Sequence, residues 1–156
     1  MDDFRAYLDL LRELSGSLDR LTGLAKEKTA AVRKDDLMGL DAALKQEQAM
    51  SLALRGLEQK RVTLLKGLGL ENTPLTELPA NCPAELRNET KKAVETLRRS
   101  YEVYRTAADV ARDTLECNLH ELEKLVEQMG GRQTGGAGYA APSAEPPKKM
   151  KTDFRA

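Results

Sequence analysis

The side chains with the most chemical potential fall in one short segment, and they are Glu116, Cys117, His120 and Glu123. On a helix these positions are within reach of one another, so the first chemistry to consider is metal binding. Dimetal carboxylate bundles take two Glu-x-x-His units from different helices, whereas this chain has a single histidine. The sequence also lacks a phosphate loop, a dinucleotide fingerprint and a nucleophile elbow. We therefore expect that the protein is not an enzyme and that it binds neither a metal ion nor any other cofactor.

The composition favours helices over sheets. More than half of the 156 residues are Ala, Glu, Lys, Leu or Arg, a share typical of coiled coils and long helices. Isoleucine and tryptophan are absent, so few of the residues that pack well in strands are available. Acidic and basic side chains balance at 25 each, which gives no general attraction to nucleic acid or to anionic lipid. The predicted fold class is all-α, with no nucleic-acid partner.

The cysteines and the apolar runs indicate a cytoplasmic protein. Cys82 and Cys117 form neither a CxxC pair nor a disulfide framework. The first residues are acidic, where a secretory signal would be basic, and no apolar run is long enough to span a bilayer. We expect a reducing compartment and no direct membrane insertion.

Leucine spacings of three and four residues divide the body into long helices. They predict helices over about 2–33, 36–68 and 84–129, which would pack as an antiparallel bundle or coiled coil in one domain, residues 1–129. The polar turn 34–36 should separate the first two helices. Glycines at 67 and 69 and prolines at 74, 79 and 83 keep most of the connector 70–83 out of regular helix.

Two features of the third helix each allow two interpretations. Asn118 occupies a core heptad position between Leu115 and Leu122, where it either fixes the register or offers its amide to a partner. A second stripe also runs along this helix. We expect it to face a second neighbour inside the bundle, the alternative being an exposed groove; its members are Val103, Ala107, Val110, Thr114 and Cys117.

Residues 130–156 form a tail of different composition, with five glycines, three prolines and no leucine. Such a segment buries too little apolar surface to order alone, so we predict a disordered tail. Met150 and Phe154 stand four apart near its end and would share one face of a helix formed on a partner. An inert solubilising tail is the alternative.

The layout resembles the FlgN-type flagellar export chaperones. The resemblance rests on a leucine-rich first helix, a Lys-Asp-Asp-Leu turn over 34–37, and a second helix that ends in Glu58-x-x-Arg61-x-x-Leu64-Leu65-x-x-Leu68-Gly69. It continues with Asn118-Leu119-x-x-Leu122 and with the final Asp153-Phe154-Arg155-Ala156.

This resemblance implies a cytosolic chaperone that binds flagellar hook-associated proteins and delivers them to the cytosolic domain of the flagellar export gate. Since the family binds cargo through its C-terminal part, the implied partner-binding residues are Asn118, Leu119, Leu122, Leu125, Val126, Met129, Met150, Phe154 and Arg155. Tyr139 is the implied candidate for contacting the gate. The alternative is a homo-oligomeric coiled-coil adaptor without an export role, and a homodimer is compatible with either function.

Overall fold

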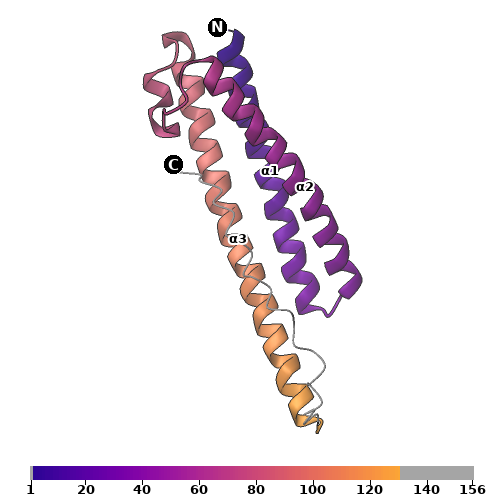
Figure 1. Ribbon diagram of the computed structural model, residues 1–156. Coiled ribbons are helices and arrows are strands. Elements are labelled where there is room, and N and C mark those ends of the chain that lie inside the picture. Colours follow the sequence, from indigo (N-terminus) through magenta and orange to yellow (C-terminus); the bar gives the residue numbers. More distant parts are fainter. Residues whose placement is uncertain (1, 131–156) are drawn as a thin grey trace. The chain divides into compact units, whose positions relative to one another are not determined.

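The computed structural model describes residues 2–130. They form an all-α bundle without strands, which confirms the predicted fold class. The elements are the α-helices α1 (Asp2–Arg33), α2 (Leu37–Gly67) and α3 (Arg87–Gln128), with 3₁₀-helices η1 (Leu75–Ala80) and η2 (Ala84–Leu86) between the last two (Figure 1). The chain divides into two compact units, whose described parts are residues 2–115 and 116–130.

The turn between α1 and α2 shows why the chain reverses there. Asp35 adopts the left-handed conformation, with φ of 54°, and the Asp36 backbone N–H donates to the Ala31 carbonyl across 2.9 Å. Both features belong to the Schellman motif that closes helices. Asp36 then caps α2, because its Oδ1 accepts a hydrogen bond from the Gly39 N–H at 2.9 Å. A Cβ at Gly39 would lie only 2.3 Å from Asp36 Oδ2, so glycine allows this cap.

The same closing motif ends α2. Gly69 has φ of 70°, and the Leu70 N–H donates to the Leu65 carbonyl at 2.9 Å. Beyond it, the connector forms only 3₁₀ turns, and Pro79 lies inside η1. Leu78 in η1 is fully buried, so the connector contributes to the hydrophobic core.

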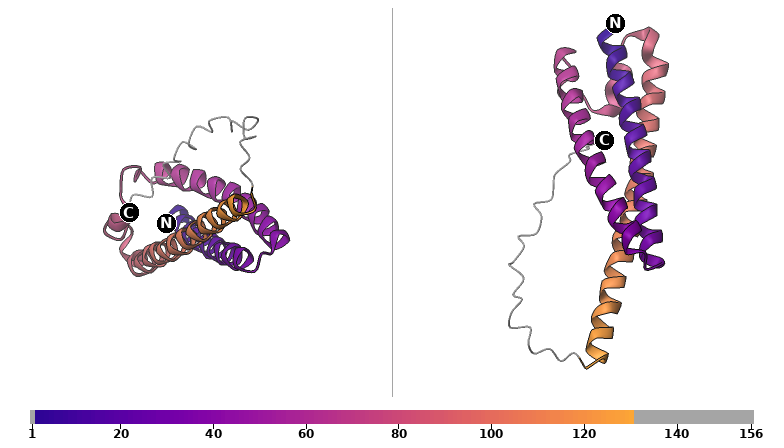
Figure 2. Two further views of the ribbon diagram at one scale, coloured as in Figure 1. Left: turned by 90° about the horizontal axis from the view of Figure 1, so that it is seen from below. Right: turned by 90° about the vertical axis from the view of Figure 1, so that its right-hand side faces the viewer.

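Within residues 2–115, α1 is the central helix. Fifteen of its 32 residues are buried, against three of 31 in α2. α2 runs antiparallel to α1, and the first part of α3 runs in the direction of α1 (Figures 1 and 2). Aliphatic side chains from α1 dominate the core, and the rest of the chain adds Leu57, Leu65, Leu78, Cys82, Leu86, Ala93, Val94 and Leu97.

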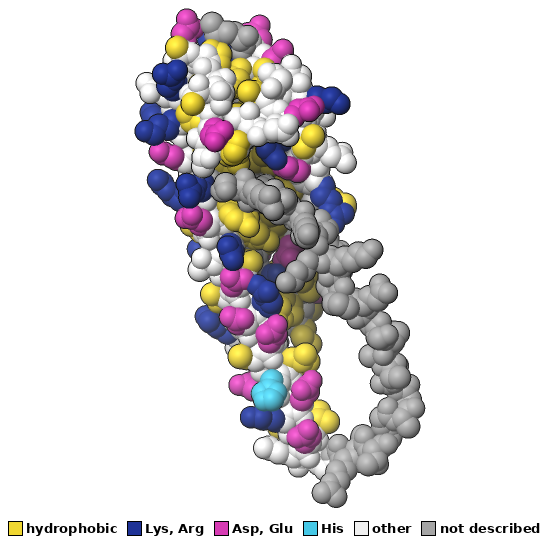
Figure 3. Space-filling view, turned by 60° about the vertical axis from the view of Figure 1, so that its left-hand side comes forward, with side chains coloured by type: hydrophobic (Ala, Val, Ile, Leu, Met, Phe, Trp, Pro, Cys, Tyr) yellow, Lys and Arg dark blue, Asp and Glu magenta, His cyan; other side chains and the backbone are white. Residues whose placement is uncertain are grey.

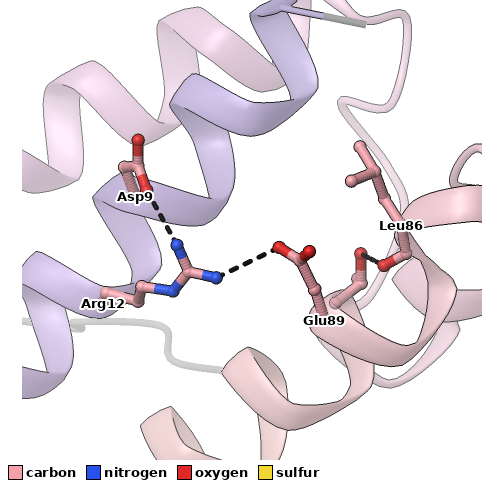
Figure 4. A network of polar contacts seen from close by, with 5 residues as sticks. Asp9, Arg12, Leu86 and Glu89 are labelled. Atoms are coloured by element: carbon pink, nitrogen blue, oxygen red, sulfur yellow. Dashed lines mark hydrogen bonds and ion pairs between the residues drawn. The ribbon is translucent and has the colours of Figure 1, made fainter.

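Polar contacts tie α1 to both neighbours. Arg12 on α1 reaches Asp9 at 2.9 Å and Glu89 on α3 at 3.3 Å (Figure 4). Lys28 on α1 pairs with Glu47 on α2 at 2.6 Å. The exposed Arg12 pairs add little stability, but the Lys28 pair is largely shielded from water and is correspondingly stronger. None of the helices in the described range is long and apolar enough to cross a membrane.

Candidate partner-binding surface

An exposed apolar stripe covers the last turns of α3, in the second unit. Leu122 and Leu125 are 51% and 52% exposed, and Met129 is 78% exposed. Spacings of three and four residues place these side chains on one helix face. We define the α3 stripe as Leu119, Leu122, Leu125, Val126 and Met129. Large apolar patches of this kind on a monomer usually mark an interaction site.

Glutamates line one edge of the α3 stripe. Glu116, Glu123 and Glu127 follow one another at spacings of seven and four residues, so they share a helix face beside the leucines. Residues 116–129 carry four glutamates against one lysine. The surface is therefore amphipathic with an acidic edge, and it can bind an apolar helix through burial and select a basic flank through charge.

Asn118 lies at the start of this surface. The sequence placed it at a buried core position, but the structure leaves it half-buried, and Leu115 one turn earlier is half-buried as well. That placement was wrong, because the packed core of α3 ends at Ala111, the last of its buried residues. A half-buried amide can be hydrated, so Asn118 needs no protein partner to satisfy it.

The second stripe of α3 also differs from its prediction. We expected a second helix to cover it, yet Val103 and Val110 are 49% and 43% exposed. They line an apolar groove of about 580 Å³ within the first unit, between the C-terminal part of α1 and the middle of α3. The other lining residues are Lys26, Thr29, Ala30, Arg33, Glu102, Thr106 and Ala107. Between Lys26 and Arg33, α1 offers this second stripe only the small residues Thr29 and Ala30, which leave it open; we call this the α1–α3 groove.

A polar cluster between α1 and α2 was missed by sequence reasoning. Arg61 forms two hydrogen bonds with Glu58, from Nε to Oε2 at 3.0 Å and from Nη2 to Oε1 at 2.7 Å. The hydrogen bond to Glu58 raises the pKa of Arg61. The Tyr7 hydroxyl is buried and has no hydrogen-bond partner at good geometry among the described residues. Burial raises the pKa of Tyr7, and its polar interaction with the nearby Arg61 side chain, together with the Arg61 charge, opposes the rise.

A second polar layer joins all three helices. The Lys28–Glu47 pair lies near Tyr104 of α3, and the pKa of Tyr104 is raised by burial first and by the Glu47 carboxylate second. These contacts join residues far apart in sequence. The only available signal was Lys28 and Glu47 at otherwise apolar helix positions.

The four residues first considered for metal binding belong to neither of these two polar clusters. His120 and Cys117 are exposed, and the histidine is visible in cyan on a charged surface in Figure 3. Across residues 2–130, no three His, Cys, Asp or Glu side chains are grouped so as to hold a metal ion. The remaining predicted site residues, Tyr139, Met150, Phe154 and Arg155, lie outside the described residues, as does the tail itself.

Comparison with known proteins assigns the family. The sequence model of the FlgN protein family matches residues 1–146. No curated protein and no solved structure gives a significant match. Since the match spans most of the chain, the protein belongs to the FlgN family, whose members are flagellar export chaperones and not enzymes. It therefore binds flagellar proteins as its cargo.

Proposed function

We propose that this FlgN-family chaperone binds hook-associated proteins of the hook–filament junction in the cytosol and delivers them to the cytosolic domain of the flagellar export gate. The observation that carries this proposal is the α3 stripe, five large apolar side chains that are each at least half exposed. Covering them with cargo would remove apolar surface from water on both partners, at about 25 cal/mol per Å².

The spacing of the α3 stripe suits a helical cargo segment. A helix docking along it presents apolar side chains at positions i, i+3, i+4 and i+7. Such a segment is apolar and unpaired before the subunits assemble, so the chaperone would also prevent its premature association. Ordering the segment costs several kcal/mol, which lowers the affinity and makes release at the gate feasible.

The tail would add to the cargo site. We propose that Met150, Phe154 and Arg155 contact cargo together with Asn118 and the α3 stripe. Tyr139 would contact the export gate. Serine substitutions at Met150 and Phe154 in the full chain should then weaken cargo binding in calorimetry; equal affinity would remove the tail from the mechanism.

A matched pair of leucine variants tests the site. Leu122→Gln places an amide in the α3 stripe, whereas Leu52→Gln makes the same change on α2, where Leu52 is 66% exposed. We expect Leu122→Gln to weaken binding of a purified hook-associated protein at least about tenfold, which corresponds to 1.4 kcal/mol. Leu52→Gln should bind like wild type. Equal weakening by both variants, or by neither, would contradict a cargo site on α3.

A homo-oligomeric adaptor is the competing function, and stoichiometry separates the two. The chaperone should form a one-to-one complex with its cargo in light scattering. An adaptor should keep the same oligomer whether or not a hook-associated protein is added.

A further inference from the structure

The glutamates beside the α3 stripe have no basic partner in the described part of the chain. Glu116, Glu123 and Glu127 are exposed, and none of them forms an ion pair with any residue between 2 and 130. At about 3.6 residues per turn, the row of the stripe nearest to them consists of Leu119 and Val126. These two side chains are 59% and 56% exposed. A row of free carboxylates, which we call the acidic edge, therefore runs beside a row of uncovered apolar side chains.

The end of the tail has the complementary sequence pattern. Lys148, Lys151 and Arg155 follow one another at spacings of three and four residues, so on a helix they would share one face. Met150 and Phe154 would form the neighbouring face. Two prolines directly precede the segment, and proline favours the first turn of a helix. So short a helix is unstable alone in water, and the segment needs a surface on which to fold.

We infer that residues 148–155 dock on the acidic edge of the same molecule as a short helix antiparallel to α3. On both helices the charged row follows the apolar row in the same rotational sense. The two charged rows and the two apolar rows can therefore meet at once only when the helices run antiparallel. Lys148, Lys151 and Arg155 then face the glutamates, and both segments belong to the second unit.

The connection is long enough for the tail to return to α3. Sixteen residues, 131–146, lie between the docking segment and the end of the described chain. A chain of that length without regular structure spans roughly 20 Å, about the length of the helix from 116 to 129. A segment tethered this closely has an effective concentration on the order of 1 mM at its site. Contacts that are individually weak therefore suffice to hold it.

The docked segment would leave most of the α3 stripe to cargo. It covers the row formed by Leu119 and Val126, whereas the other three apolar side chains lie farther from the acidic edge. Met150 and Phe154 then form one wall of the remaining surface, where they can contact cargo. This consequence rests on the proposed function. The docking itself is measured without cargo, so the two can fail separately.

Matched lysine substitutions in the full chain test the docking. Glu123→Lys reverses a charge of the acidic edge, whereas Glu121→Lys makes the same change at an exposed glutamate on another face of the helix. A nitroxide on the exposed Cys117 should broaden the backbone amide NMR signals of residues 148–155 in wild type, relative to the same sample after reduction; Cys82 is buried and stays unlabelled. We expect Glu123→Lys to weaken docking about threefold and to reduce the broadening. Glu121→Lys should leave it unchanged.

A compensating charge reversal identifies the pairing. The tail variant K148E/K151E and the edge variant E116K/E123K each place like charges opposite one another, so each alone should weaken docking about tenfold. The combined fourfold variant should restore the broadening, because opposite charges face each other again. Wild-type docking should also weaken as ionic strength rises, since the Debye length falls to about 3 Å at 1 M salt.

Circular dichroism checks that each variant is folded. Glu123→Gln, with Glu121→Gln as its control, replaces the charge reversal if a lysine disturbs the helix. Absence of broadening in wild type, equal effects of the substitutions at 121 and 123, or a combined variant that fails to recover would each overturn the inference. Broadening that appears only as the protein concentration rises would overturn it as well, because the tail would then dock on another molecule.

Discussion

Helix α1 and the last turns of α3 have the same leucine spacing but opposite surroundings. Leu11 and Leu14 in α1 are 0% and 1% exposed, whereas Leu122 and Leu125 are about half exposed. α1 is tied to a neighbour on each side, by Arg12 to α3 and by Lys28 to α2. The spacing thus encodes an amphipathic helix, and the available neighbours decide whether its apolar face becomes core or contact surface.

Polar residues in the two regions differ in burial and in how their hydrogen bonds are satisfied. Ser15, Thr22 and Thr29 repeat every seven residues along α1 and are buried, and each hydroxyl donates to the carbonyl four residues earlier at 3.0 to 3.1 Å. Their small side chains allow close packing without leaving an unsatisfied group. Asn118, the polar residue bordering the α3 stripe, is half-buried and can be hydrated. These three buried hydroxyls are satisfied within the helix, whereas the Asn118 amide near the stripe stays open to water or a partner.

Alanine substitutions should separate the two regions most strongly. Leu11→Ala removes a fully buried side chain and should lower the free energy of unfolding by about 3 kcal/mol, through lost burial and the resulting cavity. Leu122→Ala should change it by less than about 0.5 kcal/mol. Urea denaturation monitored by circular dichroism measures both. Similar losses at the two positions would show that the stripe is already covered in the free protein.

The pair between Glu58 and Arg61 should give the next largest effect. Glu58→Ala leaves the shielded Arg61 guanidinium without its two hydrogen bonds and should cost about 2 kcal/mol of stability. The double variant E58L/R61M removes both charges and should lie within about 1 kcal/mol of wild type. A double variant as unstable as Glu58→Ala would mean that the ion pair itself stabilises the fold, beyond the cost of leaving one shielded charge without its partner.

Tyr7→Phe should stabilise the protein by about 1 kcal/mol, because it removes a buried hydroxyl whose contact with Arg61 lacks hydrogen-bond geometry. The raised pKa of Tyr7 adds a pH signature. The stability linked to it is fully present below its ordinary pKa of 10.0 and is lost as pH rises through the folded-state pKa. The advantage of the phenylalanine variant should therefore grow above pH 10. Chemical denaturation at neutral and alkaline pH measures this, and a destabilised variant would place a hydrogen bond on the hydroxyl.

The sequence allowed the helices to be predicted better than their contacts. Leucine spacing and the Asp35-Asp36 turn act within a few residues, so the helices and the reversal between the first two could be inferred from local pattern. The exposure of Val103 depends on which distant side chains reach it. The small residues of α1 opposite it follow no rule of spacing along α3. The same reason applies to Tyr7 and Arg61, which meet across two helices, and to the wrong placement of Asn118 in the core.

Asn118→Leu should have the smallest effect on the free energy of unfolding. Asn118 lies between the last buried residue of α3, Ala111, and the exposed α3 stripe. A leucine in a buried position would gain apolar burial and raise stability by more than 1 kcal/mol, about 1.5 to 3 kcal/mol when fully covered. At a half-buried position the gain should stay below about 0.5 kcal/mol in urea denaturation. The variant also extends the α3 stripe by one apolar residue, so it should bind a purified hook-associated protein about two- to threefold more tightly in calorimetry while stability hardly changes. A large gain in stability with unchanged cargo affinity would instead place Asn118 in the interior of the bundle and move the start of the contact surface toward Leu119.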